Sequence, residues 1–213
     1  MLEELAYSVK VRDREIQQAR GKPITHTEWS DYLRIFALQG KPRECWEGKK
    51  ILDVGSGLKF EPPDRAFPGA RVYAIDPEFG KGGRLPHASH TAHEKREAIC
   101  QAIPYDDNKF DFVFASHSAP QSLGIEEVPR SLCELIRVMK PGGEIRLVLC
   151  AENQGITTEI KDVLIKNGFV VEFEGPMTII KASERISNNK VAKDNAWGKI
   201  HREFFPKVKL RQA

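Results

Sequence analysis

The sequence has few cysteines and no long apolar segment. None of its four cysteines forms a C-x-x-C pair, which argues against a disulfide scaffold or a cysteine-based zinc ribbon; they are Cys45, Cys100, Cys133 and Cys150. No apolar run approaches the roughly 18 residues that span a bilayer, and the first residues are acidic where a signal peptide would be basic. We therefore expect a cytoplasmic protein with no membrane partner.

A strong excess of charge of one sign is also lacking, because the net charge of the 213 residues is only +3. Hydrophobic residues make up 40% and charged residues 30%, which is typical of a folded domain. The positive charge is concentrated near the C-terminus, where residues 185–213 contain eight lysines and arginines against two acids. This tail is the part of the chain best suited to phosphate contacts.

Short apolar runs alternate with helical patterns after residue 49, which predicts an α/β domain. Four runs are continuous enough for the strands of a buried, mainly parallel sheet, at about 50–54, 71–75, 110–116 and 144–150. Between the last two, a helix is expected at about 128–139, ended by Lys140-Pro141-Gly142-Gly143. The stretch from 77 to 103 leaves open a helix at 91–100 or a third strand near Cys100.

A further helix is expected at 157–167, followed by two apolar runs within 169–182. Glu174-Gly175-Pro176 joins these runs, which predicts an antiparallel hairpin. The domain therefore covers residues 49–183. It lies between an N-terminal helical extension at 1–48 and a basic C-terminal extension at 184–213.

Each extension has two interpretations. The large apolar residues of an N-terminal helix either form a lid over an acceptor pocket or bury the helix on the core; they are Trp29, Tyr32, Leu33 and Phe36. In the C-terminal extension, cations next to aromatic residues suit RNA binding. The helical spacing of Trp197, Ile200 and Phe204, with Phe205 beside them, instead predicts packing on the domain, and we favour packing.

Glycines and acids follow two of the expected strands. The run Ile51–Gly57 reads ILDVGSG, and its glycines allow the backbone to approach a ligand closely. Asp76 ends the next strand, where a carboxylate can accept hydrogen bonds from a ribose diol. Together these residues predict an adenosine-type cofactor. Phe60 occupies the position of the third glycine of a dinucleotide fingerprint, which disfavours a nicotinamide dinucleotide.

Four segments in this order resemble class I S-adenosylmethionine-dependent methyltransferases of the LDVGSG type. They are ILDVGSG, VYAIDP, IPYDDNKFDFVFASHS and RVMKPGGEIRLVL, within residues 50–150. The resemblance implies a Rossmann-like α/β fold whose seven-stranded, mainly parallel sheet ends in a C-terminal antiparallel hairpin. It also implies a methyltransferase that uses S-adenosyl-L-methionine.

The resemblance assigns roles to individual residues. The methionine part of the cofactor would lie against Asp53, Gly55, Ser56 and Gly57, and the ribose hydroxyls would bind Asp76. Pro77 is a further expected cofactor-binding residue. Gln101, Ala102 and Ile103 would flank the adenine, with Ser116 at the end of the fourth strand. Ile99 stands where many relatives have an Asp for the adenine amine, and Gln101 is the expected substitute. His117 is the candidate general base.

No metal site is expected, because the three-residue spacing of His87, His90 and His93 fixes no tetrahedral geometry. The expected acceptor is a small molecule or a glycan. Two alternatives stay open: an RNA methyltransferase that uses the basic tail, and a noncatalytic methyltransferase-like binding module.

Overall fold

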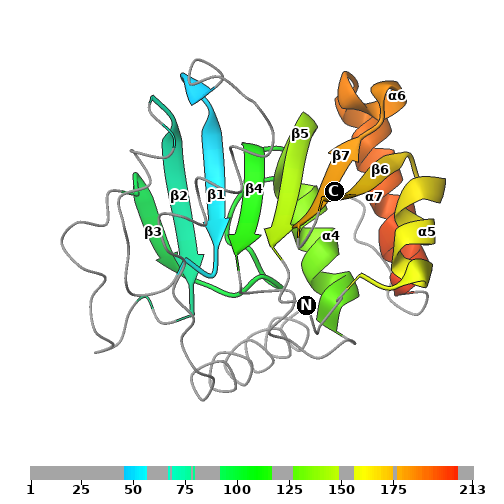
Figure 1. The fold of residues 1–213 in the computed structure, drawn as a ribbon, viewed down its shortest axis with the longest axis horizontal. Coiled ribbons are helices and arrows are strands. Elements are labelled where there is room, and N and C mark those ends of the chain that lie inside the picture. The colour runs from blue at the N-terminus through cyan, green and yellow to red at the C-terminus, as the bar shows by residue number, and fades with distance from the viewer. Residues whose placement is uncertain are drawn as a thin grey trace, which may run out of the picture.

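The computed structural model describes residues 46–56, 67, 69–77, 79, 92–116, 127–148, 156–174 and 177–205. Within these ranges one seven-stranded sheet has the order β3-β2-β1-β4-β5-β7-β6 (Figure 1). Its strands are β1 (Lys50–Val54), β2 (Arg71–Asp76), β3 (Glu94–Glu97), β4 (Phe110–Ser116), β5 (Met139–Val148), β6 (Phe169–Glu174) and β7 (Met177–Ala182). All pairs are parallel except β5–β7 and β6–β7, which confirms the predicted fold class and hairpin.

The described helices are α4 (Val128–Val138), α5 (Thr158–Lys166), α6 (Glu184–Ser187) and α7 (Lys190–Phe204). Helix α4 forms as predicted, with a proline in its first turn and Leu132, Leu135 and Ile136 fully buried. These side chains belong to the main core, together with Leu52 and Val113 of the central strands. No helix among the described residues is long and apolar enough to cross a membrane.

For the stretch between 77 and 103, the sequence left a helix at 91–100 or a third strand as alternatives. The structure has the strand, at Glu94–Glu97. Strand β3 is short and entirely charged in sequence, EKRE, so no apolar pattern marks it. It forms because it pairs in parallel with β2, with Tyr73 opposite Glu94, at one edge of the sheet. Charged side chains are suited to such an edge because they face water and oppose pairing with another chain.

The start of β5 differs from the prediction. The strand begins at Met139 and not at Glu144, so residues 140–143 do not simply separate helix from strand. The register with β4 shifts between Phe110 and Phe112, which accommodates the extra residues as an irregularity. Gly142 has a φ of +71°, and a Cβ on Gly143 would lie 2.7 Å from Met139 Cγ, so both glycines are needed.

The C-terminal extension packs on the domain, which confirms the favoured interpretation of its apolar residues. Ile200 of α7 is fully buried, and Trp197, Phe204 and Phe205 pack against the main core. The Trp197 indole N–H donates to the carbonyl oxygen of Cys133 in α4, at 2.9 Å. The predicted N-terminal helices and residues 206–213 lie outside the described residues.

A smaller core cluster covers the other side of the sheet. It contains Trp46, Ile51, Phe67, Val72 and Phe114. The Trp46 ring meets that of Phe67 edge-on, with centroids 5.1 Å apart. Trp46 precedes β1, so the end of the N-terminal extension is already part of the packed structure.

Candidate functional site

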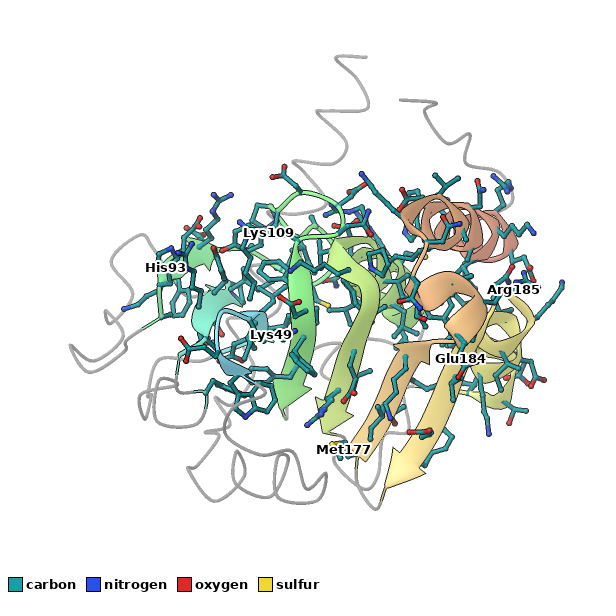
Figure 2. The ribbon with its side chains drawn as sticks, turned by 90° about the horizontal axis from the view of Figure 1, so that it is seen from above. Lys49, His93, Lys109, Met177, Glu184 and Arg185 are labelled. Carbon is teal, nitrogen blue, oxygen red and sulfur yellow. The ribbon has the colours of Figure 1, made fainter. Side chains whose placement is uncertain are left out.

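The sheet has a point where its connections diverge, between β1 and β4. The chain goes from β1 to β2 on one side and returns to β4 on the other (Figure 1). In open α/β sheets, ligands bind outside the carboxyl ends of the strands at such a point. His93 and Lys109 directly precede β3 and β4, so they mark the amino ends of these strands, opposite the expected ligand site (Figure 2).

The carboxyl end of β1 turns sharply at Gly55. This residue has a φ of +70°, a conformation that favours glycine. Its N–H donates to Ile75 O at 2.8 Å, and the Ser56 N–H donates to the same oxygen at 3.2 Å. The turn is therefore fixed against β2 without a Cβ at its centre, so a ligand can approach the backbone closely. Gly57 lies outside the described residues.

Two buried acids lie on neighbouring strands. Asp53 is opposite Ala74 of β2 and Phe114 of β4, in the middle of the sheet. Asp76 is the last residue of β2, and its carbonyl oxygen accepts hydrogen bonds from Phe79 and Ala98. These contacts hold the end of β2 and the segment after β3 together, with Pro77 half-buried next to Asp76.

The side chain of Gln101 is buried, and the described residues offer its amide no hydrogen-bond partner. The residue is 3% exposed, and neither its amide nitrogen nor its amide oxygen has a hydrogen-bond partner among the described residues. A buried amide without partners is costly, and such groups are rare in folded proteins. Because the amide offers a donor and an acceptor side by side, it fits a ligand with the complementary pair.

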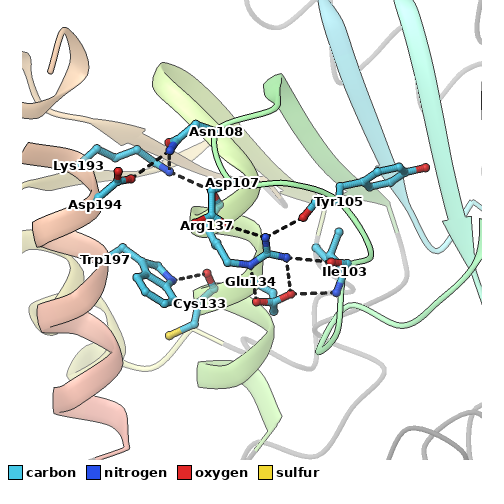
Figure 3. A network of polar contacts seen from close by, with 10 residues as sticks. All are labelled: Ile103, Tyr105, Asp107, Asn108, Cys133, Glu134, Arg137, Lys193, Asp194 and Trp197. Carbon is cyan, nitrogen blue, oxygen red and sulfur yellow. Dashed lines mark hydrogen bonds and ion pairs between the residues drawn. The ribbon is translucent and has the colours of Figure 1, made fainter. Parts of the chain in front are cut away.

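The segment that carries Gln101 is held in place by α4 (Figure 3). The N–H of Ile103 donates to the Glu134 carboxylate at 2.9 Å, and the Ile103 carbonyl accepts from the Arg137 guanidinium at 2.8 Å. Arg137 also donates to Tyr105 O at 2.7 Å. Two side chains of one helix thus fix the backbone on both sides of Pro104.

The charge of Arg137 is stable in this position. Burial lowers its pKa, but hydrogen bonds and the charges of Glu134 and Asp107 outweigh burial and raise the pKa above its ordinary value. The guanidinium is therefore always available to hold the two carbonyls. Sequence reasoning included Arg137 in a motif but missed this role, because the two carbonyls that it binds lie 32 and 34 residues earlier in the chain.

Glu127 is a second candidate that the sequence analysis missed. One of its carboxylate oxygens is buried without a hydrogen-bond partner among the described residues, immediately before α4. The Ser131 hydroxyl donates to Glu127 O at 3.1 Å, and the Cys100 thiol lies 4.0 Å from Ser131 O. The first turn of α4 is therefore next to the Gln101 segment. An acid directly before the predicted helix is the signal that could have identified it.

The structure describes only some of the predicted residues. Ala102 and Ile103 lie in the segment held by α4, and Ser116 ends β4 opposite Val148. His117 lies outside the described residues, as do His87 and His90. In the described ranges, no three or more His, Cys, Asp or Glu side chains are grouped as metal ligands.

Comparison with known proteins shows which of them this chain resembles. A family model described as "Methyltransferase domain" matches residues 52–147. A demethylmenaquinone methyltransferase of Clavibacter sepedonicus is 36% identical over 107 residues, which cover 48% of this chain and 41% of that protein. The biotin biosynthesis bifunctional protein BioHC of Cellvibrio japonicus is 31% identical over 118 residues, 53% of this chain and 21% of that protein. The chain thus spans less than half the length of these curated relatives.

A solved structure supports the fold. Magnesium protoporphyrin IX methyltransferase from Synechocystis PCC 6803, crystallised with bound S-adenosylmethionine, superposes with a TM-score of 0.50 at 15% identity. The superposition covers 72% of this chain and 77% of that one. At this identity the likeness concerns the fold alone.

Proposed function

We propose that this chain, whose residues 52–147 match a family model described as "Methyltransferase domain", transfers a methyl group from S-adenosyl-L-methionine to a small-molecule or glycan-type acceptor. The observation that carries the proposal is the buried amide of Gln101 in the segment after β3, which has no hydrogen-bond partner in the part of the chain that the structure describes. A Gln amide pairs with adenine through one donor and one acceptor. The residues present therefore fit an adenosyl group.

Each part of the cofactor has a group of residues to hold it. The turn at Gly55 and Ser56, continuing to Gly57, with Asp53 before it, would hold the methionine part. Asp76 and Pro77 at the end of β2 would take the ribose. Gln101, Ala102 and Ile103 would flank the adenine, and Ser116 would border the site at the end of β4. We assign this unit to residues 49–183, with extensions on both sides.

When bound, the cofactor supplies a methyl group already activated by its sulfonium. The protein contributes mainly by positioning, since methyl transfer is an in-line displacement that requires alignment. A base is needed only where the acceptor must lose a proton. His117, which follows β4 directly, is our candidate for that base.

The acceptor is proposed from the relatives. A small molecule is favoured because the demethylmenaquinone methyltransferase, by its name, acts on one. RNA has less support, because Trp197 and Phe204 of the basic extension pack against the core. A noncatalytic binding module remains the alternative from another class, and the same experiment tests it.

Calorimetric titration of the full chain with S-adenosylmethionine and with S-adenosylhomocysteine tests the proposal. We expect micromolar dissociation constants for both ligands. S-inosylhomocysteine, which has a carbonyl in place of the adenine amine, should bind at least about tenfold more weakly than S-adenosylhomocysteine. Absence of binding at millimolar ligand would overturn the methyltransferase proposal and favour the binding module.

The Gln101→Leu variant separates the role of the amide from general damage. Removing two unsatisfied polar atoms from a buried site should leave the unliganded protein at least as stable as the wild type. The same change should weaken binding of S-adenosylhomocysteine about tenfold. Asn195→Leu, at an exposed position of α7, is the matched control and should change neither quantity. Unchanged affinity in Gln101→Leu would refute the adenine assignment alone.

A further inference from the structure

A buried lysine of the C-terminal extension contacts the turn that precedes β4. Lys193 of α7 is 1% exposed. Its ammonium donates to Asn108 Oδ1 at 2.7 Å and to the Arg137 carbonyl at 3.1 Å (Figure 3). A buried ammonium is costly unless acceptors surround it, so these two contacts fix the place of Lys193 closely.

Asn108 is held by α7 at both ends of its side-chain amide. Its oxygen accepts from Lys193, and its nitrogen donates to Asp194 Oδ1 at 3.0 Å. The residue has a φ of +58°, and it is the one non-glycine residue with a positive φ in the described ranges. Such a conformation persists where the surroundings fix it. Two consecutive residues of α7 therefore hold the turn between Asp107 and Lys109.

Arg137 connects this turn to the Gln101 segment. Its carbonyl oxygen accepts hydrogen bonds from Lys193 and from the Asn108 N–H, the latter at 2.9 Å. Its guanidinium binds the carbonyls of Ile103 and Tyr105. Figure 3 shows this continuous path of polar contacts from α7, through α4, to the segment that follows β3.

We propose that Lys193 is a positioning residue for the cofactor, which holds the 101–108 segment in its binding conformation through Asn108 and Arg137. This inference rests on the proposed function. It makes α7 part of the cofactor-binding unit, although α7 follows the sheet in sequence.

The groups around Lys193 give the inference a pH signature. Burial lowers the pKa of Lys193 to about 8; the charges of Asp194 and Asp107 oppose this shift, and those of Arg137 and Lys190 add to it. The ammonium therefore deprotonates above about pH 8, and its hydrogen bonds to the two oxygens weaken. Cofactor affinity should fall over this range.

The contribution of Lys193 to the free energy of unfolding should rise over the same pH range in which cofactor affinity falls. The pKa of Lys193 is lower in the folded protein than the ordinary 10.5, so between about pH 8 and 10.5 the unfolded chain binds more protons at this residue. Its contribution to the free energy of unfolding therefore rises with pH. A fall in affinity together with a rise in this contribution distinguishes positioning from a purely structural role.

The experiment compares the wild-type chain with Lys193→Met and Lys190→Met, the latter at an exposed lysine of the same helix. Titration with S-adenosylhomocysteine at pH 7 should show about tenfold weaker binding for Lys193→Met and no change for Lys190→Met. The wild-type affinity should fall above pH 8, and that of Lys193→Met should not. If the wild type binds but Lys193→Met binds equally well, the inference fails alone; if the wild type does not bind, the proposed function fails with it.

Hydrogen exchange gives a second readout that needs no ligand. The Ile103 N–H, which donates to Glu134, should exchange about tenfold faster in Lys193→Met than in wild type. If Lys193→Met does not fold, Asn108→Gly replaces it, because glycine tolerates the positive φ and removes both side-chain contacts with α7. Unchanged exchange and affinity in that variant would overturn the inference.

Discussion

Arg137 is predicted to be a large local contributor to stability. Its guanidinium donates five hydrogen bonds, two to Glu134, one to Asp107, and one each to the carbonyls of Ile103 and Tyr105. Arg137→Met keeps much of the apolar stem but removes all five. The two main-chain carbonyls contribute about 1 kcal/mol each. The pair with Glu134 adds about 1 kcal/mol after allowance for its partial exposure, so we expect a loss of about 3 kcal/mol.

Urea denaturation of Arg137→Met and of Arg137→Lys measures this loss. The slope of the free energy of unfolding against urea should stay the same, because the exposed surface of the unfolded chain does not change. Lysine keeps the charge but lacks the planar fork, so Arg137→Lys should recover less than half of the lost stability. A loss below about 1 kcal/mol for Arg137→Met would refute the view that this side chain holds the segment.

Two further predictions concern the core. Burial raises the pKa values of Cys100 and Cys133 to about 12, so both thiols stay protonated at pH 8. Both should resist iodoacetamide until denaturant is added, as measured by peptide-resolved mass spectrometry. Labelling of either thiol in the native protein would contradict their burial. Leu132→Ala, at a fully buried position of α4, should cost about 2–5 kcal/mol in thermal or urea unfolding. Ile165→Ala, at a position 48% exposed on α5, should cost less than about 1 kcal/mol, and equal losses would refute the predicted core.

Much of the fold was predictable from local patterns. Strands β1, β2 and β4 are continuous apolar runs, and α4 has buried residues at helical spacing, so each element carries its own signal. Strand β3 does not, because its residues Glu94–Glu97 are all charged and become a strand only through pairing with β2. The early start of β5 was also missed, since residues 140–143 are typical of a helix end.

Some features of the candidate site were also predictable from the sequence, and others were not. Gly55 and Asp76 could be found from the sequence because each directly follows or ends a strand whose pattern is clear. The unsatisfied state of Gln101 could not, because it depends on what surrounds a side chain after folding. Nor could the role of Lys193, whose partner Asn108 is 85 residues earlier in the chain.

The sequence by itself determined the class of fold and the order of the motifs. It also determined that the glycine turn and the acids lie at the carboxyl ends of the strands. These follow from short-range periodicity and from the meeting of parallel strands at their carboxyl ends. Only the tertiary structure decided that the C-terminal extension packs on α4 and contacts Asn108 in the turn before β4. Hydrogen bonds between residues distant in the chain leave no local pattern, because only folding brings their partners together.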